Sequence, residues 1–437
     1  MNTIDSIPIS KVQRASKLFS TGAKVGVNYI KYYGSKLTDS EQIARAKLNE
    51  NNAEDIYDGL KNLKGSALKV AQMLSMEKSI MPQAYVEKFS LSQFSVPPLS
   101  PPLVLRTFKK YFGKTPHEVF DHFDATSVNA ASIGQVHRAV KDDKILAVKI
   151  QYPGVANSIG SDLALVKPIA LKMFNIRGKD SDKYFKEVEN KLMEETNYHQ
   201  EIFQSLEIAA SCRHIPHLRF PDYYPEFSSD KILTMDWMQG EHLSEYVQHD
   251  NKQQDLDKIG QALWDFFMYQ IHVLKKVHAD PHPGNFLVSE DKELIALDFG
   301  CIKIIPDSFY SPYFELVDEK ILSNPKLFSE KLYELEILLS TDTKEEVAFF
   351  TEMFHELLSV FVEPFQKEVF DFSNDTFFRK ISSLSEKYSK NTELRKMNGN
   401  RGSKHFIYMN RTFFGLYNLM FDLQAKNVTI NNYRSLV

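Results

Sequence analysis

Acidic and amide side chains near residue 280 have the types and the spacing that phosphoryl transfer requires. The segment HADPHPGN at 278–285 contains Asp280 and Asn285, five positions apart, and Asp298 of a DFG triplet follows 13 positions later. Carboxylate and amide oxygens are the ligands that Mg²⁺ prefers in proteins. Phosphoryl transfer needs mainly positioning and neutralisation of charge. We therefore expect ATP and Mg²⁺ as cofactors, with Asn285 and Asp298 as metal ligands and Asp280 orienting the nucleophile.

Two other interpretations of this segment compete with phosphoryl transfer. His278, Asp280 and His282 would form a transition-metal cluster if the two imidazoles lay one helical turn apart. Pro281 and Pro283 disrupt a helix at this place. The segment could also be a proline-rich turn that Asp and Asn side chains cap. The DFG triplet at its downstream offset favours phosphoryl transfer over both.

A lysine inside an apolar strand is the second candidate for chemistry. The segment AVKI at 147–150 is similar to the kinase strand whose lysine contacts the α- and β-phosphates of ATP. Lys149 needs a glutamate partner from the next helix, and the segment EETNYHQEIFQ offers Glu194, Glu195 and Glu201. Glu194 and Glu201 are seven positions apart and are expected to share one helix face. We favour Glu201 as the partner of Lys149.

A small-residue segment upstream of this lysine has the position of a phosphate-binding loop. The segment NAASIGQVH occupies 129–137, and Ala130, Ala131 and Ser132 are its expected ATP contacts. Small side chains let the backbone approach phosphate, but alanine restricts φ more than glycine does. Because Gly134 is the only glycine, we expect a stiffer loop; a plain strand turn is the alternative.

The elements that must position these residues indicate an α+β fold of two lobes like that of protein kinases. Residues 1–102 are expected to form a helical N-terminal extension that ends at a proline-rich break, which a helix cannot cross. Residues 103–238 mix short strands with helices, including a charged helix at 182–210, and correspond to the small lobe. Residues 239–437 are expected to form a mostly helical C-terminal lobe.

The connection between the predicted lobes is the expected adenine site. The strand KILTMD runs into a linker, and Met235–Met238 is the expected hinge. The backbone of Asp236 and Met238 would then bind the adenine ring of ATP between the lobes.

The composition excludes several other classes of protein. The net charge of −4 argues against a broad nucleic-acid footprint, which needs a basic face. The two cysteines, Cys212 and Cys301, are too far apart in sequence for a CxxC pair and indicate a reduced compartment. The N-terminus lacks the apolar core of a secretory signal, and no apolar run reaches membrane-spanning length. We expect a cytoplasmic protein, with peripheral membrane contact through amphipathic helices as an extension.

The motifs in combination resemble the UbiB/AarF/ADCK family of atypical kinases. The matching segments are AASIGQVHRA, AVKIQYPGV, HADPHPGN and LDFG, and the resemblance covers roughly residues 50–430. It implies that an N-terminal helix brings Lys69 and Gln72 over the kinase-like site, and that Glu195 opens the family's ExD motif. It also implies an ATPase or small-molecule kinase linked to isoprenoid quinone biosynthesis or lipid homeostasis, with a lipid or quinone precursor as ligand.

The chain departs from the family pattern at three positions. Ala71 replaces the glycine of the KxGQ motif, Asn197 replaces the aspartate of ExD, and Asn129 replaces the first alanine of the loop.

Two rival functions accompany the family interpretation. One is a small-molecule kinase like the aminoglycoside phosphotransferases, and the other is a nucleotide-sensing scaffold of a quinone or lipid pathway without turnover.

Overall fold

The chain folds into two compact units. The computed structural model describes residues 11–35, 40–63, 84, 88, 98–130, 133–173, 180–389, 401–430 and 433. Unit 1 comprises Met1–Phe203 and Asp222–Trp237, and unit 2 comprises Gln204–Pro221 and Met238–Val437. The last crossing, from Trp237 to Met238, falls inside the segment predicted as the hinge. The division into an extension and two lobes at residues 102 and 238 stays a prediction.

Unit 1 contains an antiparallel sheet with strand order β1-β3-β4-β6, and β2 also pairs with β3. Asp142 and Asp143 connect β3 to β4 with positive φ angles, as a two-residue hairpin turn requires. Leu146, Val148 and Ile150 of β4 are buried in one core cluster, so the alternation of the strand places Lys149 on the other face. The strands are β1 His122–Phe123, β2 Asn129–Ala130, β3 Gly134–Lys141, β4 Lys144–Gln151 and β6 Ile232–Asp236.

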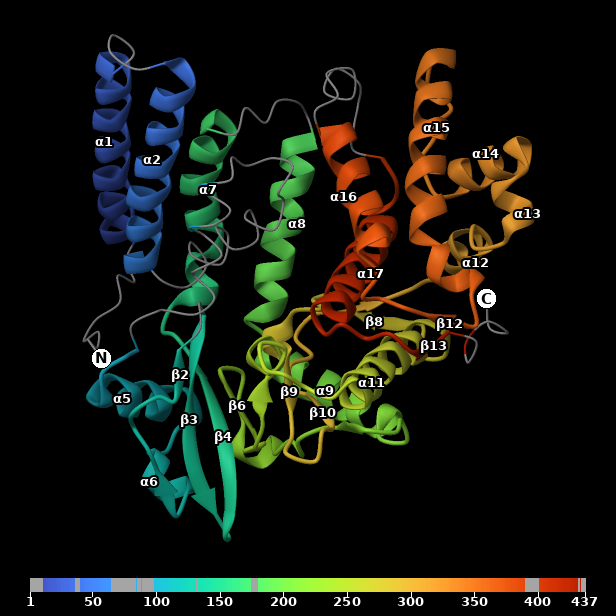
Figure 1. Ribbon diagram of the computed structural model, residues 1–437. Helices are drawn as coiled ribbons and strands as arrows, with labels where there is room; N and C mark the ends of the chain where they lie inside the picture. The colour runs from blue at the N-terminus through green and yellow to red at the C-terminus, as the bar shows by residue number, and fades with distance from the viewer. Residues whose placement is uncertain are drawn as a thin grey trace. The chain divides into compact units, whose positions relative to one another are not determined.

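Long helices accompany this sheet within unit 1. In Figure 1, α1 and α2 lie side by side and α7 lies next to them, with α8 packed on α7. The short helix α5 begins at Pro101, because proline is tolerated in the first turn of a helix, and ends at Phe112, with Gly113 as its C-cap. The helices are α1 Lys11–Ser35, α2 Glu41–Leu63, α5 Pro101–Phe112, α6 Pro116–Val119, α7 Val155–Met173, α8 Asp180–Glu195 and the 3₁₀ turn η2 Pro225–Phe227.

Helix α1 buries polar side chains and exposes apolar ones. Arg14 is buried, and its guanidinium donates to both carboxylate oxygens of Asp162 on α7, at 2.7 and 2.6 Å. Asn28, two heptads along the same face, donates to the side chains of Asn52 and Asp55 on α2. Thr21 lies between them and is buried as well. Polar contacts therefore hold α1 to its neighbours.

The helix predicted at 182–210 is two helices. Helix α8 ends at Glu195, and α9 begins at Tyr198 and runs to Cys212. Asn197 ends the helical path because its Oδ1 accepts from the backbone N–H of Gln200, which is an N-cap contact. The expectation that Glu194 and Glu201 share one helix face is therefore wrong, since the two residues belong to different helices.

Among its described residues, unit 2 contains three small sheets. The largest has strand order β5-β10-β9-β7, with β5 parallel to β10 and the other pairs antiparallel. The two others pair β8 with β11 and β12 with β13. The strands are β5 Leu218–Arg219, β7 Glu241–His242, β8 Lys276–His278, β9 Phe286–Val288, β10 Leu294–Ala296, β11 Ile302–Ile304, β12 Val369–Phe370 and β13 Val428–Thr429.

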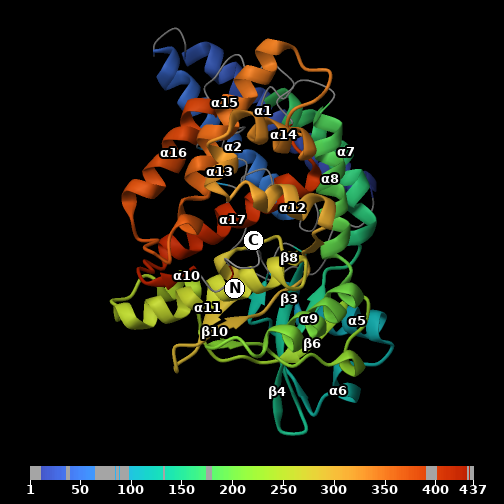
Figure 2. The same ribbon diagram turned by 90° about the vertical axis from the view of Figure 1, so that its right-hand side faces the viewer.

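Helices make up most of unit 2. Helix α11 is the centre of its core, with Trp264, Phe266 and Phe267 fully buried. Helix α17 packs against both α11 and α12 (Figure 2). The helices are α10 Leu243–Tyr246, α11 Gln253–His272, η3 Pro283–Asn285, α12 Asp307–Glu315, α13 Glu319–Leu322, α14 Pro325–Glu334, α15 Lys344–Phe361, η4 Glu363–Gln366, α16 Asp375–Ser389 and α17 Lys404–Asp422.

In the part of the chain that the structure describes, no helix has both the length and the apolar composition needed to cross a bilayer.

Candidate active site

Lys149 and Glu201 form an ion pair inside unit 1. The Nζ of Lys149, on β4, lies 2.8 Å from Oε1 of Glu201, on α9. The side chain of Glu201 is 4% exposed and that of Lys149 is 19% exposed. A carboxylate buried to this degree needs a cationic partner, because an unpaired buried charge is costly. The pairing favoured from the sequence is the one that the structure contains.

Tyr198 also contacts this lysine, although no sequence pattern singled it out. The Nζ of Lys149 lies 4.9 Å from the centre of the Tyr198 ring, within the range of a cation–π interaction. Tyr198 precedes Glu201 by three positions on α9, so the two side chains share a helix face. The three-residue spacing from Glu201 was the sequence signal that could have identified Tyr198. The ring and the carboxylate together hold the ammonium group in place.

The departure at Asn197 keeps the local structure that an aspartate would support. Asn197 caps α9, and its carbonyl accepts from the N–H of Glu201 at 3.0 Å. Aspartate and asparagine cap helices about equally well. Glu195 is the last residue of α8, half-buried, and therefore lies on a different helix from Glu201. Asn197 therefore caps the start of α9, the helix that positions Glu201.

The predicted phosphate loop is described only at its ends. Ala130 lies in β2 opposite Gln135 of β3, whereas Ala131 and Ser132 lie outside the described residues. Gly134 begins β3, and a Cβ there would lie 2.7 Å from the carbonyl oxygen of Ile150. The glycine of this segment is therefore required by the close approach of β3 to β4.

The middle of β3 is fixed by a buried polar chain. The imidazole of His137 contacts the side-chain nitrogen of Gln135 through Nε2 and the carbonyl of Asp124 through Nδ1, each at 2.9 Å. The oxygen of Gln135 accepts from the N–H of Leu99 at 2.8 Å. Because the amide nitrogen of Gln135 can only donate, His137 is neutral with its proton on Nδ1. Burial lowers the pKa of His137 to about 4.

The predicted hinge, Met235–Met238, begins inside β6 and continues beyond its end. Asp236 ends this strand, and its carboxylate accepts from the hydroxyl of Tyr224 at 2.7 Å and from the N–H of Asp222 at 3.0 Å. Its own N–H donates to the carbonyl of Asp222. The carboxylate and the backbone N–H of Asp236 are therefore both engaged in hydrogen bonds inside unit 1. Met238 is half-buried and is the first residue of the last segment of unit 2.

The segment at 280–285 forms a closed loop in unit 2. The carbonyl of Asp280 accepts from the N–H of His282 at 2.8 Å and from Nδ2 of Asn285 at 3.0 Å. The N–H of Asn285 returns to the carbonyl of His282 at 3.0 Å. Since Nδ2 of Asn285 is used as a donor, Oδ1 is the side-chain atom that would bind a cation. The structure thus joins Asp280 and Asn285 through one loop.

The DFG triplet stands beside this loop. The N–H of Leu297 donates to the carbonyl of Asn285 at 3.0 Å, which ties Asp298 to the loop through its neighbour. One carboxylate oxygen of Asp298 accepts from the N–H of Gly300 at 2.9 Å. Phe299 is 1% exposed and packs on Phe220. The aromatic side chain anchors the triplet in the core and sets the position of the Asp298 carboxylate.

The donor set of this loop fits magnesium better than a transition metal. An amide oxygen and a carboxylate are hard ligands, and Mg²⁺ takes few protein ligands beside phosphate and water. No group of three or more His, Cys, Asp or Glu side chains suited to a metal occurs in the described ranges. His282 uses Nδ1 to accept from the N–H of Gly284 at 3.0 Å. The histidine cluster considered from the sequence is therefore not formed.

Two residues implied by the family resemblance lie elsewhere in the chain. Lys69 and Gln72, and the alanine between them, are outside the described residues. Their roles stay predictions.

Known proteins match both the sequence and the fold. A family model described as "ABC1 atypical kinase-like domain" matches residues 92–331. The curated protein "ACTIVITY OF BC1 COMPLEX KINASE 8, chloroplastic" of Arabidopsis thaliana is 26% identical over 370 residues, 82% of this chain and 48% of that protein. "Atypical kinase COQ8, mitochondrial" of Saccharomyces cerevisiae is 27% identical over 385 residues, 86% of this chain and 76% of that protein.

A solved structure extends the likeness to three dimensions. Rv3197 of Mycobacterium tuberculosis, solved in complex with erythromycin, has a TM-score of 0.60 and 25% identity, covering 91% of this chain and 97% of its own. The chain spans about half the length of several curated relatives, 48% to 58% of the first four. The kinase-like α+β fold expected from the sequence is confirmed by these matches.

Proposed function

We propose that this chain, which belongs to the family of ABC1 atypical kinase-like domains, binds ATP with magnesium and transfers its terminal phosphoryl group. The family predicted from the sequence is confirmed by the match over residues 92–331. The observation that carries the proposal is the buried ion pair of Lys149 with Glu201. Such a pair is a required part of kinase active sites, where the lysine binds the α- and β-phosphates.

Each predicted site residue has a role in this proposal. Lys149 neutralises the phosphates, while Glu201 and the ring of Tyr198 hold its ammonium group in place. Asn285 and Asp298 hold magnesium, which supplies neutralisation of the phosphate charge when it is bound. Asp280 orients the nucleophile and accepts its proton. The nucleophile is water in an ATPase and a small-molecule hydroxyl in a kinase.

The ligand class and the pathway are finer parts of the proposal. The family resemblance supports a lipid or quinone precursor as ligand and a place in isoprenoid quinone or lipid metabolism. The solved relative was determined in complex with erythromycin, which supports a small organic molecule as ligand. The second candidate function is a nucleotide-sensing scaffold that binds ATP without turnover.

The test compares two aspartate variants of the full chain. Asp298→Asn removes a proposed magnesium ligand, whereas Asp291→Asn removes a carboxylate whose side chain is 78% exposed. We expect Mg²⁺-dependent phosphate release from the parent and from Asp291→Asn, and none from Asp298→Asn. ATP binding measured by calorimetry with and without Mg²⁺ separates the candidates. Mg²⁺-dependent binding without release under any lipid condition supports the scaffold, and absence of ATP binding contradicts both.

We also propose that the outer face of α1 binds an anionic membrane surface. Phe19, Ile30 and Tyr33 are 84%, 73% and 67% exposed and lie on one side of the helix. Lys31 is exposed on the same helix, as is Lys24, which pairs with Asp55 of α2 at 3.5 Å, and the sequence of α1 contains no aspartate or glutamate. Exposed apolar side chains on a helix without acidic residues suit a membrane interface with anionic headgroups. The charge of α1 therefore matches such a surface.

Vesicle co-sedimentation tests the membrane contact. The variant Phe19→Ser/Ile30→Ser/Tyr33→Ser removes the apolar side chains, and Ile304→Ser is the control, because Ile304 is 68% exposed elsewhere in the chain. We expect the parent and the control to sediment with phosphatidylglycerol-containing vesicles and the triple variant to stay in solution. Equal sedimentation of the parent and the triple variant would show that α1 is not the contact.

A further inference from the structure

Helix α17 has a glycine at the point where it passes the loop at 280–285. A Cβ at Gly415 would lie 2.3 Å from Cγ of Pro281, and 3.3 Å from both its Cβ and its carbonyl oxygen. Carbon atoms in ordinary contact are about 3.5–4.0 Å apart. Glycine inside a helix costs roughly 1 kcal/mol relative to alanine, so helix stability does not account for this residue. The close approach to Pro281 does.

Pro281 passes any displacement on to the proposed site residues. It follows Asp280 directly, and its ring fixes φ, so the ring cannot turn away without moving the backbone. The carbonyl of Asp280 is tied to both His282 and Asn285. A push on Pro281 therefore moves Asp280 and Asn285 together.

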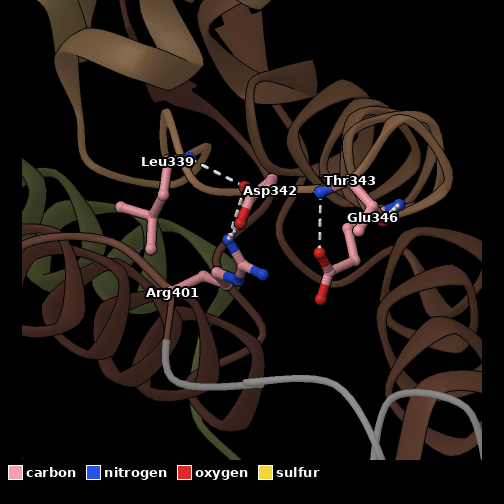
Figure 3. A network of polar contacts seen from close by, with 5 residues as sticks. All are labelled: Leu339, Asp342, Thr343, Glu346 and Arg401. Atoms are coloured by element: carbon pink, nitrogen blue, oxygen red, sulfur yellow. Dashed lines mark hydrogen bonds and ion pairs between the residues drawn. The ribbon is translucent and has the colours of Figure 1, made fainter.

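The start of α17 is fixed by a buried ion pair. One terminal nitrogen of Arg401 donates to both carboxylate oxygens of Asp342, each at 2.7 Å (Figure 3). The two side chains are 2% and 4% exposed. Asp342 also accepts from the N–H of Leu339, and Ser403 caps the first turn of α17. This end of the helix cannot shift without exposing or unpairing buried charges.

The part of α17 beside Gly415 is equally constrained. Leu416 and Tyr417 are fully buried, and the hydroxyl of Tyr417 donates to the carbonyl of Phe361 at 2.9 Å. Pro281 is half-buried and lies in a loop rather than in a helix. A side chain at position 415 would therefore displace the loop, by about 1 Å for the Pro281 ring to reach normal contact.

We infer that Gly415 is a positioning residue, through which α17 sets the place of Asp280 and Asn285 by direct packing on Pro281. The inference rests on the proposed phosphoryl transfer, because the loop at 280–285 has a catalytic role only in that reaction. The helix acts as a rigid support, and the missing Cβ sets its distance from the loop.

The test combines four variants of the full chain, with Pro281→Ala alone as the reference for the double variant. Gly415→Ala adds the clashing methyl group, and Gly415→Ala/Pro281→Ala removes the Cγ that it meets. Asn418→Ala is the control, because its side-chain amide donates to the carbonyl of Phe414 on the same helix. We expect Gly415→Ala to lower kcat by about a hundredfold with little change in the KM for ATP. The double variant should regain most of that loss relative to Pro281→Ala alone, and Asn418→Ala should behave as the parent.

A second readout does not depend on turnover. Hydrogen exchange of the amides at 279–285 should become faster in Gly415→Ala and return towards the Pro281→Ala rate in the double variant. Absence of turnover in the parent would contradict the proposed function, while the exchange data would still decide the packing inference. Parental exchange in Gly415→Ala, or an unfolding midpoint that falls together with activity and is not restored by Pro281→Ala, would overturn the inference.

Discussion

His137 occupies a site that accepts only a neutral imidazole, so acid should destabilise unit 1. Its two ring nitrogens are committed to Gln135 and Asp124, and its ring stacks on Phe123 at 5.2 Å. Burial lowers its pKa from the ordinary 6.5 to about 4. Between these two pH values the imidazole of His137 is protonated in the unfolded chain and neutral in the folded chain. The contribution of His137 to stability is therefore fully present above pH 6.5 and is lost as pH falls towards 4.

The size of this loss follows from the difference between the pKa of His137 in the unfolded chain and its pKa in the folded chain. A tenfold difference in proton affinity corresponds to about 1.4 kcal/mol, so acidification through the whole window removes about 3 kcal/mol. Between pH 7 and pH 5 the free energy of unfolding should fall by about 2 kcal/mol through His137 alone. In unit 2, burial lowers the pKa of His272 to about 3, so the parent loses stability at both positions.

Urea unfolding at pH 7 and pH 5 separates the two histidines. His137→Gln and His272→Gln each remove one titrating group, so each variant should lose less stability on acidification than the parent does. Titration of His137 by NMR in the parent measures its pKa directly and does not depend on how well the variants fold. The reasoning is refuted if His137 titrates near pH 6.5, or if the parent and His137→Gln lose the same stability.

Four further substitutions test contacts inside each of the two units. Lys149→Met leaves Glu201 buried without its cation and should lower the free energy of unfolding by about 3–5 kcal/mol while weakening ATP binding, and calorimetry and urea unfolding measure both. Arg401→Met likewise removes the cation that pairs with the buried Asp342 and should lower the free energy of unfolding. The double variant Arg401→Met/Asp342→Leu should recover most of that loss, and no recovery would contradict the pairing. Gly134→Ala should cost about 1–3 kcal/mol through overpacking at the start of β3, as thermal unfolding would show.

Patterns of a few residues predicted the strands that carry Lys149 and Asp236, and the order of the site residues along the chain. The apolar run AVKI predicted the strand that carries Lys149, whereas the hairpin turn at Asp142 and Asp143 was recognised only in the structure. The loop at 280–285 and Asp298 joined to it through Leu297 have the compact geometry that their spacing indicated. Local sequence patterns determine this strand and this loop, because the residues that contact one another in them are close together in the chain.

Features that depend on one capping residue or on distant contacts were not predictable from these patterns. The run around 182–210 is rich in helix formers, so the break at Asn197 was hidden by its neighbours. The two faces of α1 could not be assigned, because a helical pattern is usually read with its apolar side inward. Gly415 was not singled out from the sequence, because an isolated glycine in a helical run does not identify its neighbour, and Pro281 is 134 positions away.

The polar inner face of α1 has a consequence for the register of unit 1. Apolar surfaces tolerate small slides because dispersion contacts have little directionality, whereas a charged pair does not. A slide of α1 by one turn would move Arg14 about 5.4 Å from Asp162 and would leave two buried charges unpaired. The same slide would break the contact of Asn28 with Asn52. The two contacts, 14 positions apart on one face, therefore fix a single axial alignment of α1 against both of its neighbours.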